Sequence, residues 1–189
     1  MTSAVITQRT FPRSRITAVV LVIAAAALTA LAAQWRINLP FTPVPITGQT
    51  FAVLLTGAGL GWRLGTAGQI LYVGVGALGM PVFAESSGGI EVIQGATGGY
   101  LIGFIFAAGL VGWLAEHRQD RTFATMFTAF ILGSVLIYVF GVVGLMTATG
   151  RSLLEAVEGG VVPFLLGDLI KGAAAGLLLP GAWRLVGDR

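Results

Sequence analysis

Apolar runs long enough to cross a lipid bilayer recur along this chain of 189 residues. The first of them, Ile16–Ala33, contains no charged side chain, and a transmembrane helix needs about 20 predominantly apolar residues. Only 10% of the residues are charged and 56% are hydrophobic, whereas soluble proteins average roughly 25% charged residues. The polar side chains are too few to cover a surface in water, so we expect an integral membrane protein of one domain.

The apolar runs predict an all-α protein with six transmembrane helices in a compact bundle. The predicted spans are about residues 16–35, 48–62, 64–80, 98–115, 123–146 and 161–185. Glycine supplies 28 residues, and small residues let membrane helices approach closely. A cleaved signal peptide is the alternative interpretation of the first span, but its apolar run is longer than the usual 7–15 residues or so.

Two connections between the predicted spans are unusually apolar for loops in water. Residues 36–47 contain Pro40, Pro43 and Pro45, which interrupt helices and favour an extended backbone. Residues 81–97 form the longest connection, and loops longer than about 12–15 residues are often lids or binding elements. We therefore expect both segments to fold back over the outer face of the bundle as extracellular lids.

Basic residues are distributed unequally between the two ends of the predicted bundle. Arg36 and Arg151 belong to the end that carries the two lids. Eight arginines belong to the other end: Arg9, Arg13, Arg15, Arg63, Arg118, Arg121, Arg184 and Arg189. Because cytoplasmic loops carry the excess of basic residues, we expect a multi-pass protein of the bacterial cytoplasmic membrane with both termini in the cytoplasm. Basic residues scattered one or two to a loop do not form a phosphate-binding patch, so no nucleic-acid partner is expected.

Lys171, the only lysine, lies with Asp168 inside the sixth predicted span. Their i, i+3 spacing places both on one helix face, where the charges partly neutralise each other. Each charge costs about 2.5–3.5 kcal/mol to insert at the bilayer centre, and a pair with no other role could be replaced by leucines. We expect Lys171 to meet an anionic group of a ligand and Asp168 to hold and polarise the lysine. Pairing for packing specificity alone is the alternative.

Further polar and small residues in the predicted spans are weaker candidates. Gln49 and Tyr138 could each donate a hydrogen bond to a ligand, although bonds between helices explain them equally well. Ala26, Ala30 and Ala33 follow the i, i+4, i+7 spacing and share one face of the first span. Such a face permits close approach, either by a neighbouring helix of the same bundle or by a partner protein.

Signatures of catalysis are missing from the sequence. There is no cysteine, and the single histidine, His117, stands in a charged turn. A Walker A loop needs a lysine after glycine and before serine or threonine, but Lys171 stands between Ile170 and Gly172. Zinc-binding and Ser–His patterns are likewise missing. We therefore expect no enzyme, no metal site and no cofactor.

Four stretches resemble, in order, the biotin-specific S components of energy-coupling factor (ECF) transporters, the BioY family. They are LPFTPVPITGQTFAVLLTGAGLG (Leu39–Gly61), GVGALGMPVFAESSGG (Gly74–Gly89), GATGGYLIGF (Gly95–Phe104) and PFLLGDLIKG (Pro163–Gly172). The resemblance covers roughly residues 16–185. The chain departs from the family pattern at Ala96, where the family usually has proline.

The resemblance implies a six-helix membrane domain that binds biotin with high affinity from outside and carries it across the cytoplasmic membrane. It implies that Lys171 and Asp168 bind the carboxylate end of biotin, while Gly89, Thr97 and Tyr100 help to close the pocket. Biotin combines one negative charge with an apolar ring and tail, which suits a buried cation beneath an apolar lid.

The resemblance also implies three partner subunits. These are a transmembrane coupling protein and two cytoplasmic ATPases, which hydrolyse the ATP in place of this chain. S components resemble one another in an alanine-rich first helix that docks on the coupling protein, which favours the docking interpretation of Ala26, Ala30 and Ala33.

Three other functions stay open on the sequence. The chain could be an S component for another small vitamin, or a self-contained transporter in which Asp168 relays protons. It could also be a scaffold protein in which the Asp168–Lys171 pair is only structural. In a binding titration against a panel of vitamins, saturable binding of biotin would exclude the scaffold. Uptake into vesicles driven by a pH gradient without an ATPase would identify the proton-coupled transporter.

Overall fold

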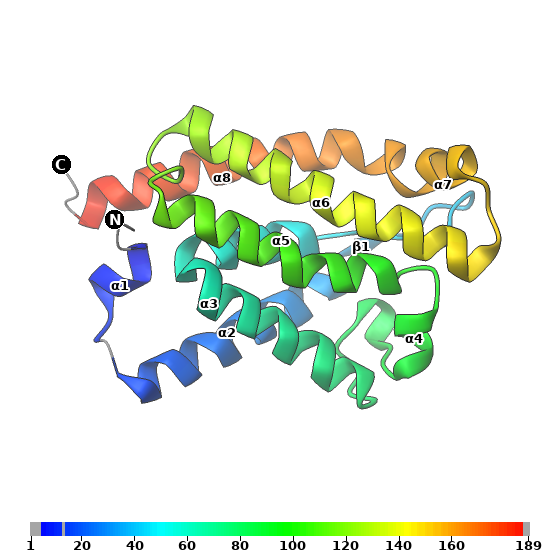
Figure 1. The fold of residues 1–189 in the computed structure, drawn as a ribbon, viewed down its shortest axis with the longest axis horizontal. Helices are drawn as coiled ribbons and strands as arrows, with labels where there is room; N and C mark the ends of the chain where they lie inside the picture. Colours follow the sequence, from blue (N-terminus) through cyan, green and yellow to red (C-terminus); the bar gives the residue numbers. More distant parts are fainter. Residues whose placement is uncertain (1–4, 13, 187–189) are drawn as a thin grey trace.

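The computed structural model describes residues 5–12 and 14–186, which form an elongated bundle of helices (Figure 1). Arg13 and Arg189, two of the arginines assigned to the cytoplasmic end, lie outside the described residues. The elements are α1 (Ile6–Thr10), α2 (Arg15–Gln34), β1 (Arg36–Ile37), β2 (Ile46–Thr47), α3 (Gln49–Ala77), η1 (Ala84–Ser86), α4 (Ile90–Gln94), α5 (Gly98–Glu116), α6 (Phe123–Thr149), α7 (Leu153–Gly160), η2 (Val162–Phe164) and α8 (Leu165–Val186).

Helices α2, α5 and α6 occupy nearly the ranges predicted from the apolar runs, but the last predicted helix begins later. The prediction placed its start at residue 161, whereas α8 begins at Leu165 after a separate helix α7 and the 3₁₀ turn η2. Helix α7 has its own start signal, because Ser152 and Glu155 form a reciprocal capping box. Pro163 then lies in η2, where its missing N–H costs least.

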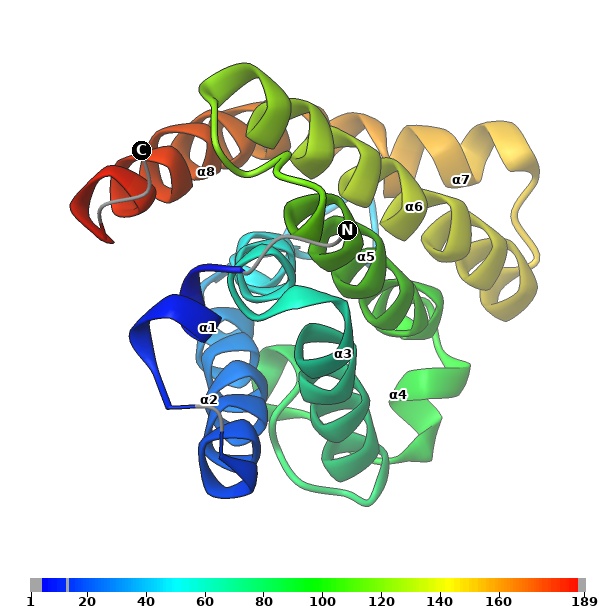
Figure 2. The same ribbon diagram turned by 60° about the vertical axis from the view of Figure 1, so that its left-hand side comes forward.

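Helix α3 is bent sharply at Gly61 instead of being two spans separated at Arg63. Gly61 has φ 81° and ψ 172°, a conformation that is essentially restricted to glycine. A Cβ added to Gly65 would lie 2.8 Å from the Cα of Gly57. The two arms of α3 therefore contact each other through their backbones beside the bend, and they run in different directions through the bundle (Figure 2).

Helix α5 lies at the centre of the bundle and packs against α3 on one side and α6 on the other (Figure 2). Helix α2 covers α3, and α8 covers α6. Gly99 and Gly144 bring the backbones of α5 and α6 together, since a Cβ added to Gly99 would lie 2.9 Å from the Cα of Gly144. The close packing predicted from the glycine content is thus present at this helix pair.

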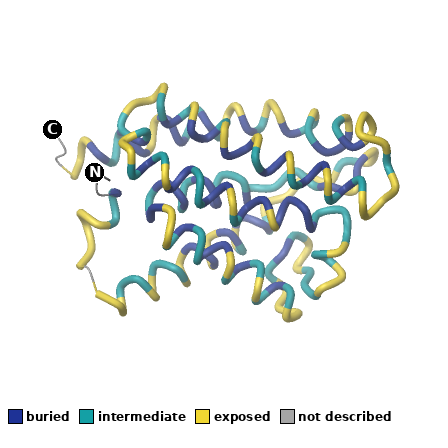
Figure 3. Tube along the Cα trace, in the orientation of Figure 1, coloured by how far each residue is buried: buried dark blue, intermediate teal, exposed yellow. Residues whose placement is uncertain are grey.

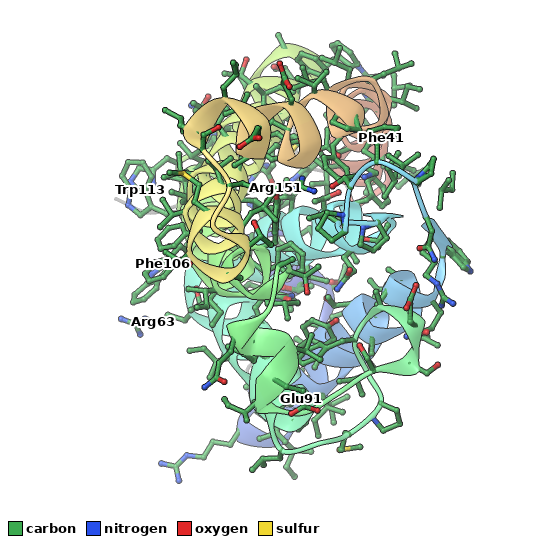
Figure 4. All side chains as sticks on the ribbon, turned by 90° about the vertical axis from the view of Figure 1, so that its right-hand side faces the viewer. Phe41, Arg63, Glu91, Phe106, Trp113 and Arg151 are labelled. Atoms are coloured by element: carbon green, nitrogen blue, oxygen red, sulfur yellow. The ribbon has the colours of Figure 1, made fainter. Side chains whose placement is uncertain are left out.

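The outer faces of the helices are apolar, as expected for contact with lipid. Buried residues follow the inner faces along the length of the bundle (Figure 3), while Phe106 and Trp113 are about half exposed and project outward (Figure 4). Four helical stretches among the described residues are long and apolar enough to cross a membrane: Arg15–Gln34, Gly98–Glu116, Phe123–Thr149 and Leu153–Val186. The two arms of α3 are not among them, so the count of six spans stays a prediction.

The two connections predicted as lids lie at one end of the bundle and turn apolar residues inward. In residues 36–47, β1 pairs antiparallel with β2. Val44, which lies in the stretch that connects the two strands, is buried. Residues 81–97 contain η1 and α4, and Phe83 in this segment is buried. Helix α7 lies at the same end (Figure 1).

Candidate functional site

A cavity of about 400 Å³ lies beneath the two connecting segments, between α3, α5, α6 and α8. Seen from this end of the molecule, α7 and α4 lie on opposite sides, and the segment with Phe41 lies on the side of α7 (Figure 4). Most of the wall is apolar, and it includes Leu39, Val44, Phe83, Val92, Leu101, Phe104, Ile137 and Phe164. Polar side chains of α3, α6 and α8 meet on one part of this wall through hydrogen bonds.

Lys171 and Asp168 line the cavity from the first turns of α8. The Lys171 Nζ lies 2.9 Å from Asp168 Oδ1 and donates a second hydrogen bond to Thr50 Oγ1 at 2.7 Å. Thr50, on the first turn of α3, in turn donates to Asp168 Oδ1 at 3.2 Å. Three side chains from two helices thus form a closed triangle of hydrogen bonds.

Tyr138 completes the polar group from α6, because its hydroxyl donates to Asp168 Oδ2 at 2.6 Å. Both carboxylate oxygens of Asp168 are therefore occupied, and the residue is only 3% exposed. An ammonium group has three N–H donors, and two of those on Lys171 have acceptors among the described residues. The remaining N–H is available to a molecule in the cavity.

Gln49 lines the cavity next to Thr50, but its hydrogen bonds lie within the protein. Its Nε2 donates to the Tyr72 hydroxyl at 2.7 Å, and its Oε1 accepts from Thr47 Oγ1 at 2.9 Å. The Tyr72 ring meets the Phe83 ring edge to face with centroids 5.4 Å apart. Gln49 therefore connects the start of α3 to the wall behind the 81–97 segment.

The three residues that the family resemblance placed at the closing loops have different surroundings. Tyr100 and Thr97 line the cavity, and the Tyr100 hydroxyl donates to the carbonyl oxygen of Gly160 at 2.8 Å, which ties α5 to α7. Gly89 is not among the lining residues. Its N–H donates to the carbonyl oxygen of Gly76 at 2.7 Å, so it anchors the 81–97 segment to the end of α3.

The alanine stripe of the first helix is mostly turned into the bundle. Ala26 is 7% exposed and Ala33 is fully buried, whereas Ala30 is half-buried. Ala26 and Ala30 line an apolar groove between α2, α3 and residues 80–86. Helix α2 packs closely on α3, so most of the stripe faces the bundle and only the part around Ala30 is accessible to a partner. Docking through this stripe stays a prediction.

Thr50 is the polar residue of the site that the sequence did not identify. A threonine in the first turn of a helix is ordinarily explained by local hydrogen bonds to the backbone. Its partners, Asp168 and Lys171, lie more than 110 residues away in sequence. The one sequence feature that could have indicated Thr50 is its position directly after Gln49, which was already a candidate binding residue.

The arrangement fits reversible binding of a small anionic molecule. Its cation, Lys171, is partly buried and already held in position by Asp168 and Thr50, and apolar side chains supply most of the remaining wall. No cluster of three His, Cys, Asp or Glu side chains that could hold a metal ion occurs in the part of the chain that the structure describes. Fold and site together define a membrane-embedded binding protein for a small ligand.

Comparison with known protein families identifies the family of this chain. A model of the BioY family matches residues 5–188. The chain is 41% identical over 142 residues to the biotin transporter BioY of Thermotoga maritima, covering 75% of this chain and 82% of that protein. It is 36% identical over 161 residues to the biotin transporter BioY of Rhizobium etli, covering 82% and 86% of the two chains. The chain belongs to the BioY family, and the resemblance found in its sequence motifs is confirmed.

A solved structure shares the fold. The S-component for biotin from an ECF-type ABC transporter matches with a TM-score of 0.80 at 23% sequence identity, covering 93% of each chain. The fold is therefore that of an S component. With the apolar helices and the named transporters among its relatives, the chain is a multi-pass membrane protein.

Proposed function

We propose that this chain binds biotin in the cavity beneath the 36–47 and 81–97 segments and takes it up across the membrane as the S component of an ECF transporter. The observation that carries the proposal is the Lys171 ammonium, which lines a mostly apolar cavity and is held by Asp168 and Thr50. The names of the relatives supply the substrate, because the curated relatives compared above are biotin transporters.

The chemistry of biotin fits this cavity. A volume of about 400 Å³ lies within the ~300–1,000 Å³ range of small-molecule sites. In this proposal the biotin carboxylate accepts a hydrogen bond from the remaining N–H of Lys171. Asp168 is held by Lys171, Thr50 and Tyr138 and keeps the ammonium in place. The apolar ring and tail then contact Phe104, Ile137 and their neighbours on the wall.

The proposed topology has six membrane crossings with both termini in the cytoplasm and the two connecting segments outside as lids. Support comes from the bend of α3, which turns the chain back, and from the arginines at the opposite end. The chain has no cysteine, so single-cysteine variants report orientation directly. A membrane-impermeant maleimide applied to intact cells should label Thr147→Cys and spare His117→Cys, and the reverse pattern contradicts the topology.

The proposed partners are a transmembrane coupling subunit and two ATPases, and the chain itself is not an enzyme. We assign the docking surface to the accessible part of the alanine stripe, around Ala30. Ala30→Trp should then leave biotin binding in detergent nearly unchanged and weaken assembly with the coupling subunit. Loss of binding and assembly together would place Ala30 in the fold instead of the interface.

A binding titration against a panel of vitamins, followed by uptake into vesicles, tests the function. We expect saturable binding of biotin and of no other vitamin in the panel. We expect uptake to require the ATPase subunits and ATP. Preferential binding of a different vitamin would assign the chain to another substrate. Uptake driven by a pH gradient without ATPases would identify a self-contained transporter, and no binding of any vitamin would favour a scaffold.

A further inference from the structure

The two segments that cover the cavity are joined to each other by one acidic side chain, Glu85. Its Oε1 accepts a hydrogen bond from Asn38 Nδ2 at 2.7 Å and lies 3.6 Å from Arg36 Nε. Asn38 and Glu85 both line the cavity. Glu85 belongs to the 81–97 segment and its two partners belong to the 36–47 segment, so this contact bridges residues that are 47 and 49 positions apart in sequence.

Gln34, the last residue of α2, holds the same turn from the other side. Its Nε2 donates to the carbonyl oxygen of Phe83 at 3.0 Å. Its Oε1 accepts from the backbone N–H and the hydroxyl of Ser86, each at 3.3 Å. The side chain of Gln34 thus forms hydrogen bonds with residues before and after Glu85, namely Phe83 and Ser86.

The turn that Gln34 holds, Ala84–Ser86, has an unusual backbone conformation. Glu85 and Ser86 have φ values of 65° and 51°, and consecutive left-handed residues other than glycine are rare. Residues in such conformations persist where their surroundings hold them, and they cluster at ligand clamps and switch regions. Phe83, directly before the turn, is buried and forms part of the cavity wall. The strained turn therefore positions a wall residue of the ligand cavity.

The contacts that hold the turn are weak because they face water. The side chains of Arg36 and Glu85 are 34% and 54% exposed, and exposed ion pairs contribute little to stability. A strained turn held mostly by exposed contacts can open without unfolding the bundle, since the helices of the bundle contribute only Gln34, the last residue of α2, to these contacts.

We propose that Glu85, with Asn38 and Gln34, forms a clasp between the two covering segments and controls how fast the ligand leaves the cavity. Closing the clasp holds the 36–47 segment against the strained turn and keeps Phe83 in the wall. Opening it separates the two segments and exposes the cavity. In this role Glu85 is a positioning residue, distinct from Lys171, which contacts the ligand; the assignment rests on the proposed binding of biotin in this cavity.

Dissociation of radiolabelled biotin from the purified full-length chain, chased with unlabelled biotin, tests the clasp. Glu85→Ala should speed dissociation about fivefold, and Glu85→Gly should speed it less, because glycine adopts the left-handed conformation without strain. Asn38→Ala should act like Glu85→Ala, and the double variant should be no faster than either single variant. Glu158→Ala, which removes an exposed acid outside the cavity, is the matched control and should match the wild type.

Hydrogen exchange of the ligand-free protein separates the clasp from the identity of the ligand. Residues 81–97 should exchange faster in Glu85→Ala than in the wild type, whether or not biotin binds. Unchanged exchange there overturns the clasp, and faster exchange with unchanged dissociation overturns its role in retaining the ligand. A wild type that does not bind biotin refutes the proposed function, while the exchange comparison still decides whether the clasp exists.

Discussion

Helix α8 contributes residues to two largely buried groups of charged and polar side chains, and the two groups differ in what surrounds them. Near its start, Asp168 and Lys171 face the cavity. About 22 Å further along the helix, Trp183 donates its Nε1–H to Asp120 Oδ2. Arg121 completes this second group, with Nε 3.2 Å from Asp120 Oδ1 and its guanidinium over the Trp183 ring.

The second group is enclosed by protein. Asp120 has no exposed surface, Trp183 is 2% exposed, and neither lines the ligand cavity. Burial raises the pKa of the Asp120 carboxyl above its ordinary value, while the hydrogen bond from Trp183 and the charge of Arg121 lower it. These donors hold the turn between α5 and α6 against the end of α8.

The difference teaches that burial of a charged pair does not by itself indicate a ligand site. Either group satisfies its carboxylate with protein donors. The Lys171 group adjoins the mostly apolar cavity, whereas Asp120, Arg121 and Trp183 are not among its lining residues. We therefore assign binding to the Lys171 group and stability to the Trp183 group, and the two assignments predict opposite responses to substitution.

Lys171→Met should lower the affinity for biotin at least about 100-fold, because a carboxylate in this cavity loses the one basic side chain among the described lining residues. Isothermal titration calorimetry measures the loss. The single variant leaves Asp168 buried without a cation, so Lys171→Met/Asp168→Asn is the matched control in which the pair is replaced by neutral groups. Normal biotin binding by this folded double variant would refute the role of Lys171, as would equal binding of biotin and biotin amide by the wild type.

Thr50→Val should weaken biotin binding about 10- to 100-fold, since hydrogen bonds to charged groups contribute about 1.5–3 kcal/mol. The valine keeps the shape of the side chain and removes the oxygen that bridges Lys171 and Asp168. Thr50→Ser retains the hydroxyl and should bind like the wild type. Equal affinities for the valine and serine variants would show that the hydroxyl plays no part in positioning the lysine.

Trp183→Phe should lower the free energy of unfolding by about 1.5–3 kcal/mol at neutral pH, because the buried Asp120 carboxylate loses a donor. The substitution raises the pKa of Asp120 further. The stability difference from the wild type should therefore shrink as the pH falls through the pKa of Asp120, where the protonated carboxyl is neutral. Denaturant unfolding at several pH values measures this, and biotin affinity should stay within about twofold. A large loss of biotin affinity in a folded variant would mean that the two groups on α8 are coupled.

Tyr100→Phe should have the smallest effect, a change in biotin affinity of a few-fold at most. The Tyr100 hydroxyl is used by the carbonyl oxygen of Gly160, and a neutral hydrogen bond contributes about 0.5–1.5 kcal/mol to stability. The ring stays in the cavity wall, so the variant should lose some thermal stability while its calorimetric titration resembles the wild type. A loss as large as that of Lys171→Met would show that the hydroxyl binds the ligand directly.

Much of the helical arrangement was predictable because membrane helices must be long and apolar. The ranges of α2, α5 and α6 follow directly from charge-free runs in the sequence. The bend at Gly61 was not predictable from the sequence, because several glycines in this segment are compatible with a turn. Only the backbone conformation in the structure distinguishes Gly61 from the others. Helix α7 was missed because its capping box stands in a short segment with two further charges.

The candidate site was predictable where the residue types are costly in a membrane. Lys171 and Asp168 stand out for that reason, and Tyr138 lies beside them as a possible hydrogen-bond donor. Thr50 and Glu85 depend on contacts across long sequence separations, which no local pattern reveals. The alanine stripe shows the reverse problem, since small residues fit the packing of α2 on α3 as well as a docking surface.

Occupation of the cavity by biotin can be measured at one position inside it. Because the chain has no cysteine, Thr97→Cys places a single thiol on the cavity wall, and Thr147→Cys places one on the exposed outer part of α6. We predict that saturating biotin slows maleimide labelling of the Thr97→Cys variant at least about tenfold and leaves labelling of the Thr147→Cys variant unchanged. Equal labelling of Thr97→Cys with and without bound biotin would contradict the assignment of this cavity as the binding site.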